Sequence, residues 1–249
     1  MGTGIRMKGR ANNSSGPSGP SEGSTRARII AAALRVFATR GFEAATLKEI
    51  TLASQTNVAA IHYHFGSKEV LIQEVLASVA NPINRMRLEL LNSVPEGPER
   101  TLVHVVRSLV APPIHLSLDS TGDARLVTRL LLQARALPSE FTSTTIFAQY
   151  DATAQHFVQA LMHATPGLSQ EDAYWRYAFA IGAMHYIVSE SEAGHHRLQR
   201  ISGGACDTSD SDAILSQLVA FVVAGFQARS PSPVAAGTQG QHGKPLHLS

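Results

Sequence analysis

The stretch from Asn57 to His64, NVAAIHYH, has residue types that suit a helix lying in the major groove of DNA. Ala59 and Ala60 are small, so a helix that carries them can approach the groove closely. His62 and its neighbours carry hydrogen-bonding groups that can reach base edges or phosphate oxygens. We therefore expect base contacts from this stretch, at Asn57, Val58, Ala59, Ala60 and His62.

Two short helices joined by a tight turn must position these residues. Thr46 precedes the first helix and Glu49 follows three residues later, the spacing of a capping box in which hydroxyl and carboxylate each satisfy a free backbone amide. The residues from Ser54 onward then break the helical pattern, and Asn57 is a second good N-cap. Two such helices, separated by three or four residues, predict a helix-turn-helix over residues 46–65.

A longer helix precedes this pair. Ser24 or Thr25 can cap its start, and Gly41 ends it. Helical spacing predicts the apolar faces of this helix and of the first short one at Ile29, Ile30, Ala33, Leu34 and Phe37, and at Leu47, Ile50 and Ala53.

Lys68 lies in the first turn of the helix that follows, after a cap at Ser67. A cation at this end opposes the helix dipole. An external anion would account for the lysine.

Residues from about Thr25 to Leu76 resemble the DNA-binding element of the TetR-type transcriptional repressors. The resemblance rests on an opening helix ending in FATRGFEAATLKEI, followed by NVAAIHYHFGSKEVL, and YHFGSKE is its most specific part. Gln55 stands where the family usually has Gly in the turn, and His62 where it usually has Tyr or Asn. Because a non-Gly residue in a left-handed turn costs roughly 1 kcal/mol, we expect a strained or differently shaped turn.

The resemblance also implies phosphate contacts. In the family, the lysine matched by Lys68 contacts a phosphate, and Tyr63 and His64 match positions that do the same. Thr46 offers a hydroxyl and helix-start amides, and the start of the first helix is implied to lie near the DNA backbone. The predicted anchors are Arg26, Arg28, Thr46, Tyr63, His64 and Lys68.

Composition suits a helical globular protein. The chain has 249 residues, 44% of them hydrophobic and 16% charged, and its long stretches show helical periodicity without convincing alternation. We expect an all-α fold, with an N-terminal three-helix DNA-binding domain and a C-terminal helical ligand-binding and dimerisation domain. The single cysteine, Cys206, excludes an internal disulfide and is compatible with the cytoplasm. We expect no membrane span and no secretion signal.

Charge is distributed unevenly along the chain. Residues 1–70 carry nine lysines and arginines against four acids, and residues 71–249 carry twelve against fifteen. A basic head on a mildly acidic body is typical of a polyanion-binding domain joined to a sensing domain.

The predicted organisation has four parts. They are a disordered arm at 1–23, a DNA-binding domain at 24–70, a regulatory and dimerisation domain at 71–229 and a disordered tail at 230–249. Predicted helices beyond the DNA-binding pair span 67–92, 99–117, 122–136, 139–164, 169–192 and 210–228, with a loop at 194–209. Prolines predict a kink or break at Pro82 and an interruption at Pro112 and Pro113. Inward positions of the helix at 67–92 are predicted at Leu71, Val75, Val79, Met86 and Leu90.

Aromatic residues concentrate in two neighbouring predicted helices, which favours an apolar ligand pocket with a few polar groups. The predicted pocket residues are Arg129, Phe147, Tyr150, His156, Trp175, Phe179 and His185. The segment LLLQARALPSEF, followed by YWRYAFAIGAMH, resembles the regulatory domain of a TetR subgroup that responds to small organic compounds. His156 and His163 are seven residues apart, but a metal site needs three or four converging ligands, so we predict no metal and no cofactor.

The last two helices are predicted to pair two subunits through small and bulky residues that include Tyr177, Ala178, Ile181, Gly182 and Met184. A symmetric dimer would read successive major grooves about 34–36 Å apart, so its operator should be an inverted repeat of double-stranded DNA.

The sequence thus predicts a ligand-released repressor that responds to a small organic effector. Two alternatives remain open: an activator or ligand-blind DNA-binding protein of the same fold, and a helical metal-dependent enzyme. We find no phosphate loop, nucleophile elbow or paired-carboxylate motif, so we expect no enzymatic activity.

Overall fold

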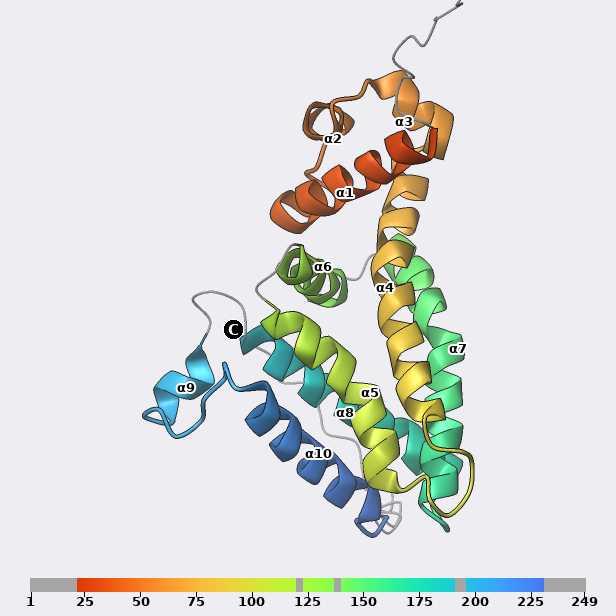
Figure 1. Ribbon diagram of the computed structural model, residues 1–249, viewed down its shortest axis with the longest axis vertical. Coiled ribbons are helices and arrows are strands. Elements are labelled where there is room, and N and C mark those ends of the chain that lie inside the picture. Colours follow the sequence, from red (N-terminus) through yellow and green to blue (C-terminus); the bar gives the residue numbers. More distant parts are fainter. Residues whose placement is uncertain (1–21, 120–122, 137–139, 191–195, 231–249) are drawn as a thin grey trace, which may run out of the picture. The chain divides into compact units, whose positions relative to one another are not determined.

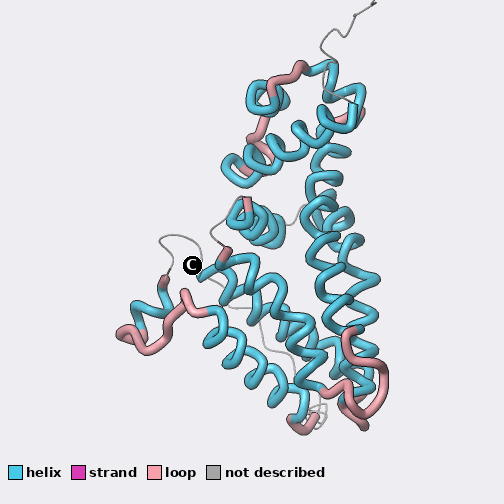
Figure 2. The backbone as a smooth tube through the Cα atoms, in the orientation of Figure 1, coloured by secondary structure: helices cyan, strands magenta, loops and turns pink. Residues whose placement is uncertain are grey.

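Helices and connecting loops make up the whole of the described chain, which contains no strand within residues 22–119, 123–136, 140–190 and 196–230 (Figure 2). The computed structural model divides into two compact units. Unit 1 consists of Met1–Asn81 and Thr121–Phe147, and unit 2 of Pro82–Ser120 and Ala148–Ser249. The predicted arm at 1–23 and tail at 230–249 lie almost entirely outside the described residues. The all-α prediction is confirmed.

Unit 1 is built around a helix-turn-helix (Figure 1). It contains α1 (Glu22–Arg40), α2 (Leu47–Ser54), α3 (Val58–Phe65), the first part of α4 (Lys68–Asn92) and α6 (Ala124–Ala136). Its core is formed by apolar side chains that follow helical spacing, and includes Ile29, Ala33, Phe37, Ile50, Ile61, Leu71 and Val75, all fully buried. Gly41 ends α1 with a φ of 82°, which glycine adopts without strain.

Unit 2 contains the rest of α4, α5 (Leu102–Leu118), most of α7 (Glu140–Ala164), α8 (Gln170–Glu190), α9 (Arg197–Ile201) and α10 (Ser211–Gln227). Within it, α5 packs against both α8 and α10 (Figure 1). One apolar core joins these helices through Leu109, Phe157, Ile181, Leu215 and Phe226. None of the described helices combines the length and the apolar character that a membrane span requires.

Several local predictions were wrong. Helix α1 begins at Glu22, so Ser24 and Thr25 lie inside it and do not cap it. Ala53 is exposed, because α2 turns Thr51 and Ser54 inward instead, and both hydroxyls bond to carbonyls of the preceding turn. The predicted loop at 194–209 contains α9, whose Leu198 amide is capped by the buried Glu190 carboxylate at 2.8 Å.

The prediction of which residues of α4 face inward beyond Pro82 was also wrong. Met86 and Leu90 are partly exposed, and the inward positions belong to Ile83, Arg87 and Leu91. An arginine occupies a core-facing position here because its guanidinium finds partners: Nε donates to the carbonyl of Leu109 at 2.8 Å.

This arginine compensates for one of the two prolines in α5, the helix that was predicted to be interrupted there. An α-helix would pair the Leu109 carbonyl with the amide of residue 113, but Pro113 has no N–H. Arg87 supplies this missing donor, and α5 continues through both prolines as one helix. Pro113 in the interior of α5 therefore requires a donor from outside the helix, and here α4 provides it.

Candidate nucleic-acid interface

The predicted capping box is present at the start of α2. The Thr46 hydroxyl accepts from the Glu49 amide at 3.2 Å, and the Thr46 amide donates to the Glu49 carboxylate at 2.9 Å. The same hydroxyl donates to that carboxylate at 3.0 Å. These bonds from Thr46, with smaller contributions from the charges of Arg40 and Lys68, hold the pKa of Glu49 below its ordinary range. The Thr46 proton is thus already engaged, and a phosphate here would meet mainly the free amides of the first turn.

The turn between α2 and α3 has a well-defined form. Gln55 adopts φ 53° and ψ 46°, in the left-handed region. Its amide donates to Leu52 at 3.3 Å and the Thr56 amide donates to Thr51 at 3.0 Å, the bond pattern of a Schellman motif. Gln55 therefore adopts the left-handed conformation that was expected to be strained, and glycine would adopt it at a lower conformational free energy.

Helix α3 presents most of the residues predicted to read bases. Asn57 caps it, with the side-chain oxygen accepting from the Ala60 amide at 2.8 Å, which leaves the Asn57 NH₂ group free to donate outward. Val58, Ala59 and His62 are exposed, and they share one face because they are spaced three and four residues apart. The opposite face is buried through Ile61 and Phe65.

The residues near the end of α3 form a second group. Tyr63 is 73% exposed, and its ring lies edge-on to that of His64 with centroids 5.0 Å apart. Lys68 is only partly exposed, and its ammonium donates to the Glu43 carbonyl at 3.1 Å. That bond gives Lys68 an internal partner and ties the start of α4 to the loop before α2.

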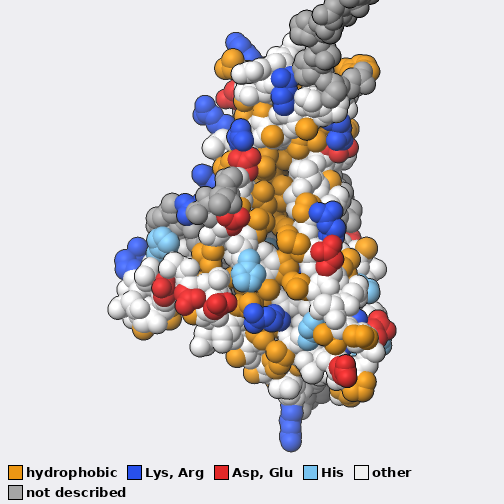
Figure 3. Space-filling view, viewed as in Figure 1, with side chains coloured by type: hydrophobic (Ala, Val, Ile, Leu, Met, Phe, Trp, Pro, Cys, Tyr) orange, Lys and Arg blue, Asp and Glu red, His pale blue; other side chains and the backbone are white. Residues whose placement is uncertain are grey.

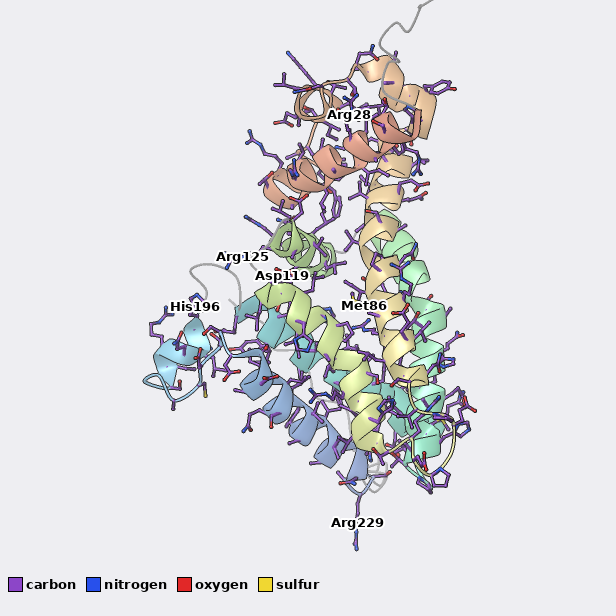
Figure 4. All side chains as sticks on the ribbon, viewed as in Figure 1. Arg28, Met86, Asp119, Arg125, His196 and Arg229 are labelled. Carbon is purple, nitrogen blue, oxygen red and sulfur yellow. The ribbon has the colours of Figure 1, made fainter. Side chains whose placement is uncertain are left out.

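The two arginines predicted on α1 differ in their surroundings. Arg26 pairs with Glu74 at 2.7 Å, and its guanidinium stands 5.4 Å from the centre of the Phe65 ring. Arg28, labelled on α1 in Figure 4, is exposed and forms no ion pair within the described part of the chain. Arg28 is therefore the better placed of the two for a phosphate. Figure 3 shows several Lys and Arg side chains on the surface of unit 1.

Described residues of unit 2 line two cavities that are large enough for a small molecule. One, of about 980 Å³, lies between residues 96–100, α7 and the start of α8, and is lined by His156, His163 and Tyr174 among others. The other, of about 840 Å³, lies between α4 and α5, with Met86, Leu90 and Arg107 in its wall. Figure 4 labels Met86 on α4 and Asp119 at the end of α5, which both line this second cavity.

Few of the predicted pocket residues line these two cavities. Of the described members, only His156 lines either cavity. Arg129 belongs to unit 1, Phe147 lies outside the residues whose side chains are described, and Tyr150 and His185 are half-buried. Trp175 and Phe179 point outward, 59% and 64% exposed, with their rings stacked at 5.9 Å. Within the described residues, no group of three or more His, Cys, Asp or Glu side chains is arranged to hold a metal.

Known proteins identify the class to which this fold and interface belong. The description "Bacterial regulatory proteins, tetR family" matches residues 29–75, which contain the helix-turn-helix. The description "Tetracyclin repressor-like, C-terminal domain" matches residues 107–225, which run from α5 into α10. The chain belongs to the TetR family of transcriptional regulators.

Individual relatives agree with this assignment. The transcriptional repressor NicS of Pseudomonas putida is 36% identical over 83 residues, which cover 32% of this chain and 38% of NicS. The transcriptional regulator UidR of Escherichia coli is 29% identical over 115 residues, or 46% of this chain and 54% of UidR. The matched stretches thus span about half or less of these relatives.

Solved structures show the same fold at low sequence identity. A TetR-like transcriptional regulator from Rhodococcus superposes with a TM-score of 0.60 at 14% identity, over 83% of this chain and 97% of that one. GusR of Salmonella enterica gives a TM-score of 0.59 at 17% identity, over 82% and 96% of the two chains.

Proposed function

We propose that this chain is a ligand-released repressor that binds an inverted-repeat operator as a homodimer in the cytoplasm. The observation that carries the proposal is the face of α3, where small exposed residues stand beside His62 and Tyr63 at the end of a capped helix. Such a face fits a major groove, which supports DNA binding. Repression is supported by the relative NicS, which is named as a transcriptional repressor.

The DNA side of the proposal assigns two roles. Base reading falls to Asn57, Val58, Ala59, Ala60 and His62, which are exposed except for the half-buried Ala60. Phosphate anchoring falls to Arg28, Tyr63, His64 and Lys68, together with the first-turn amides of α2 at Thr46. Arg26, which is paired with Glu74, would stabilise the head more than it binds DNA.

An exposed apolar face on α8 and α10 supports dimerisation. Trp175, Phe179 and Tyr186 recur along α8 at helical spacing and are 46% to 64% exposed, while Phe221 of α10 is 67% exposed. Unit 2 packs these two helices against each other, so the four aromatic rings belong to one helix pair. A second copy would cover such a surface. Ile181 and Met184 are buried in the core of one chain, so the pairing role predicted for them is wrong.

Ligand release needs a route to the DNA-binding helices, and α6 offers one. It lies within the stretch that matches the regulatory-domain description, yet it packs on α1 in unit 1. Arg35 forms a two-bonded ion pair with Asp123, with both N–O distances 3.1 Å, and the Gln133 amide donates to the Ala38 carbonyl at 3.1 Å. A ligand that displaced α6 would therefore move α1.

The cavities of unit 2 are of a size that holds small organic molecules, whose sites are usually 300–1,000 Å³. A regulator from Saccharomonospora viridis was solved in complex with choline, with a TM-score of 0.55 at 20% identity over 80% of this chain and 96% of that one.

Selection of bound duplexes from a random-sequence pool tests the proposal. Wild-type protein should enrich an inverted repeat whose half-site centres are about 34–36 Å apart. Titrating that complex with choline and with a panel of small organic compounds should identify an effector that releases the DNA. A protein that selects an inverted repeat but is never released would favour the ligand-blind alternative, and reporter expression that rises with the protein would favour an activator.

A further inference from the structure

An unusual turn ends α3, the helix proposed to read bases. Gly66 adopts φ 74° and ψ −55°, and the Ser67 amide donates across it to the Phe65 carbonyl at 2.8 Å. This is a γ-turn with positive φ, a conformation that is rare and strained for residues other than glycine. The residue has space around it, so the backbone conformation rather than crowding calls for glycine.

The turn directs the Gly66 carbonyl back toward His62. The Nδ1 atom of His62 lies 2.9 Å from that carbonyl oxygen, and the Gly66 amide donates to the His62 carbonyl, also at 2.9 Å. Two bonds thus hold the histidine side chain and the turn together, so the ring is positioned before any DNA arrives.

The partner of Nδ1 determines where the ring carries its proton. A backbone carbonyl can only accept, so Nδ1 must be the protonated donor. A neutral imidazole has one N–H, which leaves Nε2 as a bare acceptor. His62 is exposed on the same face of α3 as Val58 and Ala59, and no hydrogen bond to Nε2 is formed within the described part of the chain.

We propose that His62 presents Nε2 as a hydrogen-bond acceptor in the major groove, and so selects a base with an exocyclic amino group at the position it meets. This inference rests on the proposed DNA-binding role of α3. Adenine offers N6–H₂ and cytosine offers N4–H₂ in the major groove, while guanine offers the O6 acceptor and thymine the O4 acceptor. An acceptor aimed at O6 or O4 would be left unpaired, so the site discriminates A and C from G and T.

The discrimination should be about tenfold for each half-site, within the range expected when one base pair of a site is mismatched. It differs in kind from the guanine preference of an arginine, which donates from every nitrogen. The Gly66 γ-turn therefore sets sequence preference without touching the DNA, because it decides which imidazole nitrogen is bare.

Selection from a random-sequence duplex pool at about pH 8, where imidazole groups are ordinarily neutral, tests the inference with three proteins. Wild type should enrich A or C over G and T about tenfold at one position of each half-site. His62→Phe keeps a ring but no nitrogen and should lose the preference at that position alone. His62→Arg should reverse it to guanine. Circular dichroism would confirm that each variant keeps its helices.

The outcomes separate this inference from the proposed function. If wild type selects no inverted repeat, the proposed function fails. If it selects one in which the His62-dependent position holds G or T, or in which His62→Phe changes no position, the function stands and the acceptor role of Nε2 is refuted.

A spectroscopic measurement on the full chain tests the proton position directly. Long-range ¹H–¹⁵N spectra of histidine-labelled protein, with the His62 signals identified by their loss in His62→Phe, should show a protonated Nδ1 and a bare Nε2. Free histidine in water favours the opposite tautomer, so a signal with protonated Nε2 would overturn the inference. Gly66→Ala should shift the population toward protonated Nε2, since alanine is strained at this φ.

Discussion

Helices α3 and α8 both expose aromatic rings, but they expose them with different companions. On α3 the exposed ring of Tyr63 stands among His62, Asn57 and small residues, all with hydrogen-bonding groups or little bulk. On α8 the exposed rings of Trp175 and Phe179 stack on each other and continue toward Tyr186. The first surface suits a polar, charged partner such as a DNA groove, and the second suits an apolar partner such as another subunit. Exposure alone does not identify a partner; the chemistry around the exposed ring does.

The largest expected effect comes from removing the apolar character of α8 and α10. The double variant Phe179→Glu, Phe221→Glu should be monomeric and should bind the selected inverted repeat about a hundredfold more weakly, because the second half-site no longer adds to affinity. Light scattering and anisotropy measure the two effects. The matched control is Val103→Glu, which changes an exposed residue of α5 outside this face. A dimeric double variant would show that this face is not the interface.

The next largest effect concerns the buried donor of unit 2. Arg87→Met keeps the length of the side chain but leaves the Leu109 carbonyl unpaired, so the free energy of unfolding should fall by about 2 kcal/mol. Urea unfolding followed by circular dichroism measures it. Arg85→Met, on the exposed side of the same helix, should change stability by less than about 0.5 kcal/mol. Equal losses in the two variants would contradict the role assigned to Arg87.

A smaller pair of stability changes tests the backbone geometry of the turn between α2 and α3. Gln55→Gly should raise the free energy of unfolding by about 1 kcal/mol, because glycine occupies a left-handed position without a Cβ penalty. Ala53→Gly, at an exposed helical position two residues earlier, should lower it by about the same amount. The opposite signs make the pair a test of backbone geometry, and a stability loss at both positions would refute the Schellman turn.

The smallest effect is the pH dependence of the capping box. The pKa of Glu49 is lowered in the folded state by its bonds to Thr46, so ionisation stabilises the fold above the ordinary carboxyl value of 4.5 and this contribution disappears as pH falls through the lowered value. Glu49→Gln should therefore be less stable than wild type at neutral pH and approach it in acid. Thermal unfolding at several pH values measures the difference, and a gap that widened in acid would contradict the sign.

Much of the helix-turn-helix could be predicted because its determinants are local. Thr46, Glu49 and Asn57 act on amides two or three residues away, so their spacing in the sequence already specifies the caps that the structure shows. Gln55 was recognisable as a turn residue, whereas the sequence does not show that Gly66 directs its carbonyl to His62.

Unit 2 was harder to predict because long-range packing decides which face of each helix is buried. Trp175 and Phe179 have the residue types of a pocket, yet they are exposed, while Ile181 and Met184 form the core. Arg87 was not among the predicted inward positions, because its partner is a carbonyl of another helix. That carbonyl lacks its usual donor because Pro113 has no N–H, which has to be worked out from helix geometry. The missing N–H of Pro113 was the signal in the sequence that could have indicated a donor from another helix.

Binding of the full chain to the selected duplex across a salt series tests most directly whether α2, the turn and α3 lie against DNA. Affinity should fall steadily with salt, since bound phosphates release counterions. The double variant Tyr63→Ala, Lys68→Ala should bind at least about a hundredfold more weakly while keeping its helical content, because one anchor is lost at each position in both half-sites. A wild type without salt-sensitive affinity for duplex DNA, or a double variant that binds as tightly as wild type, would contradict the account.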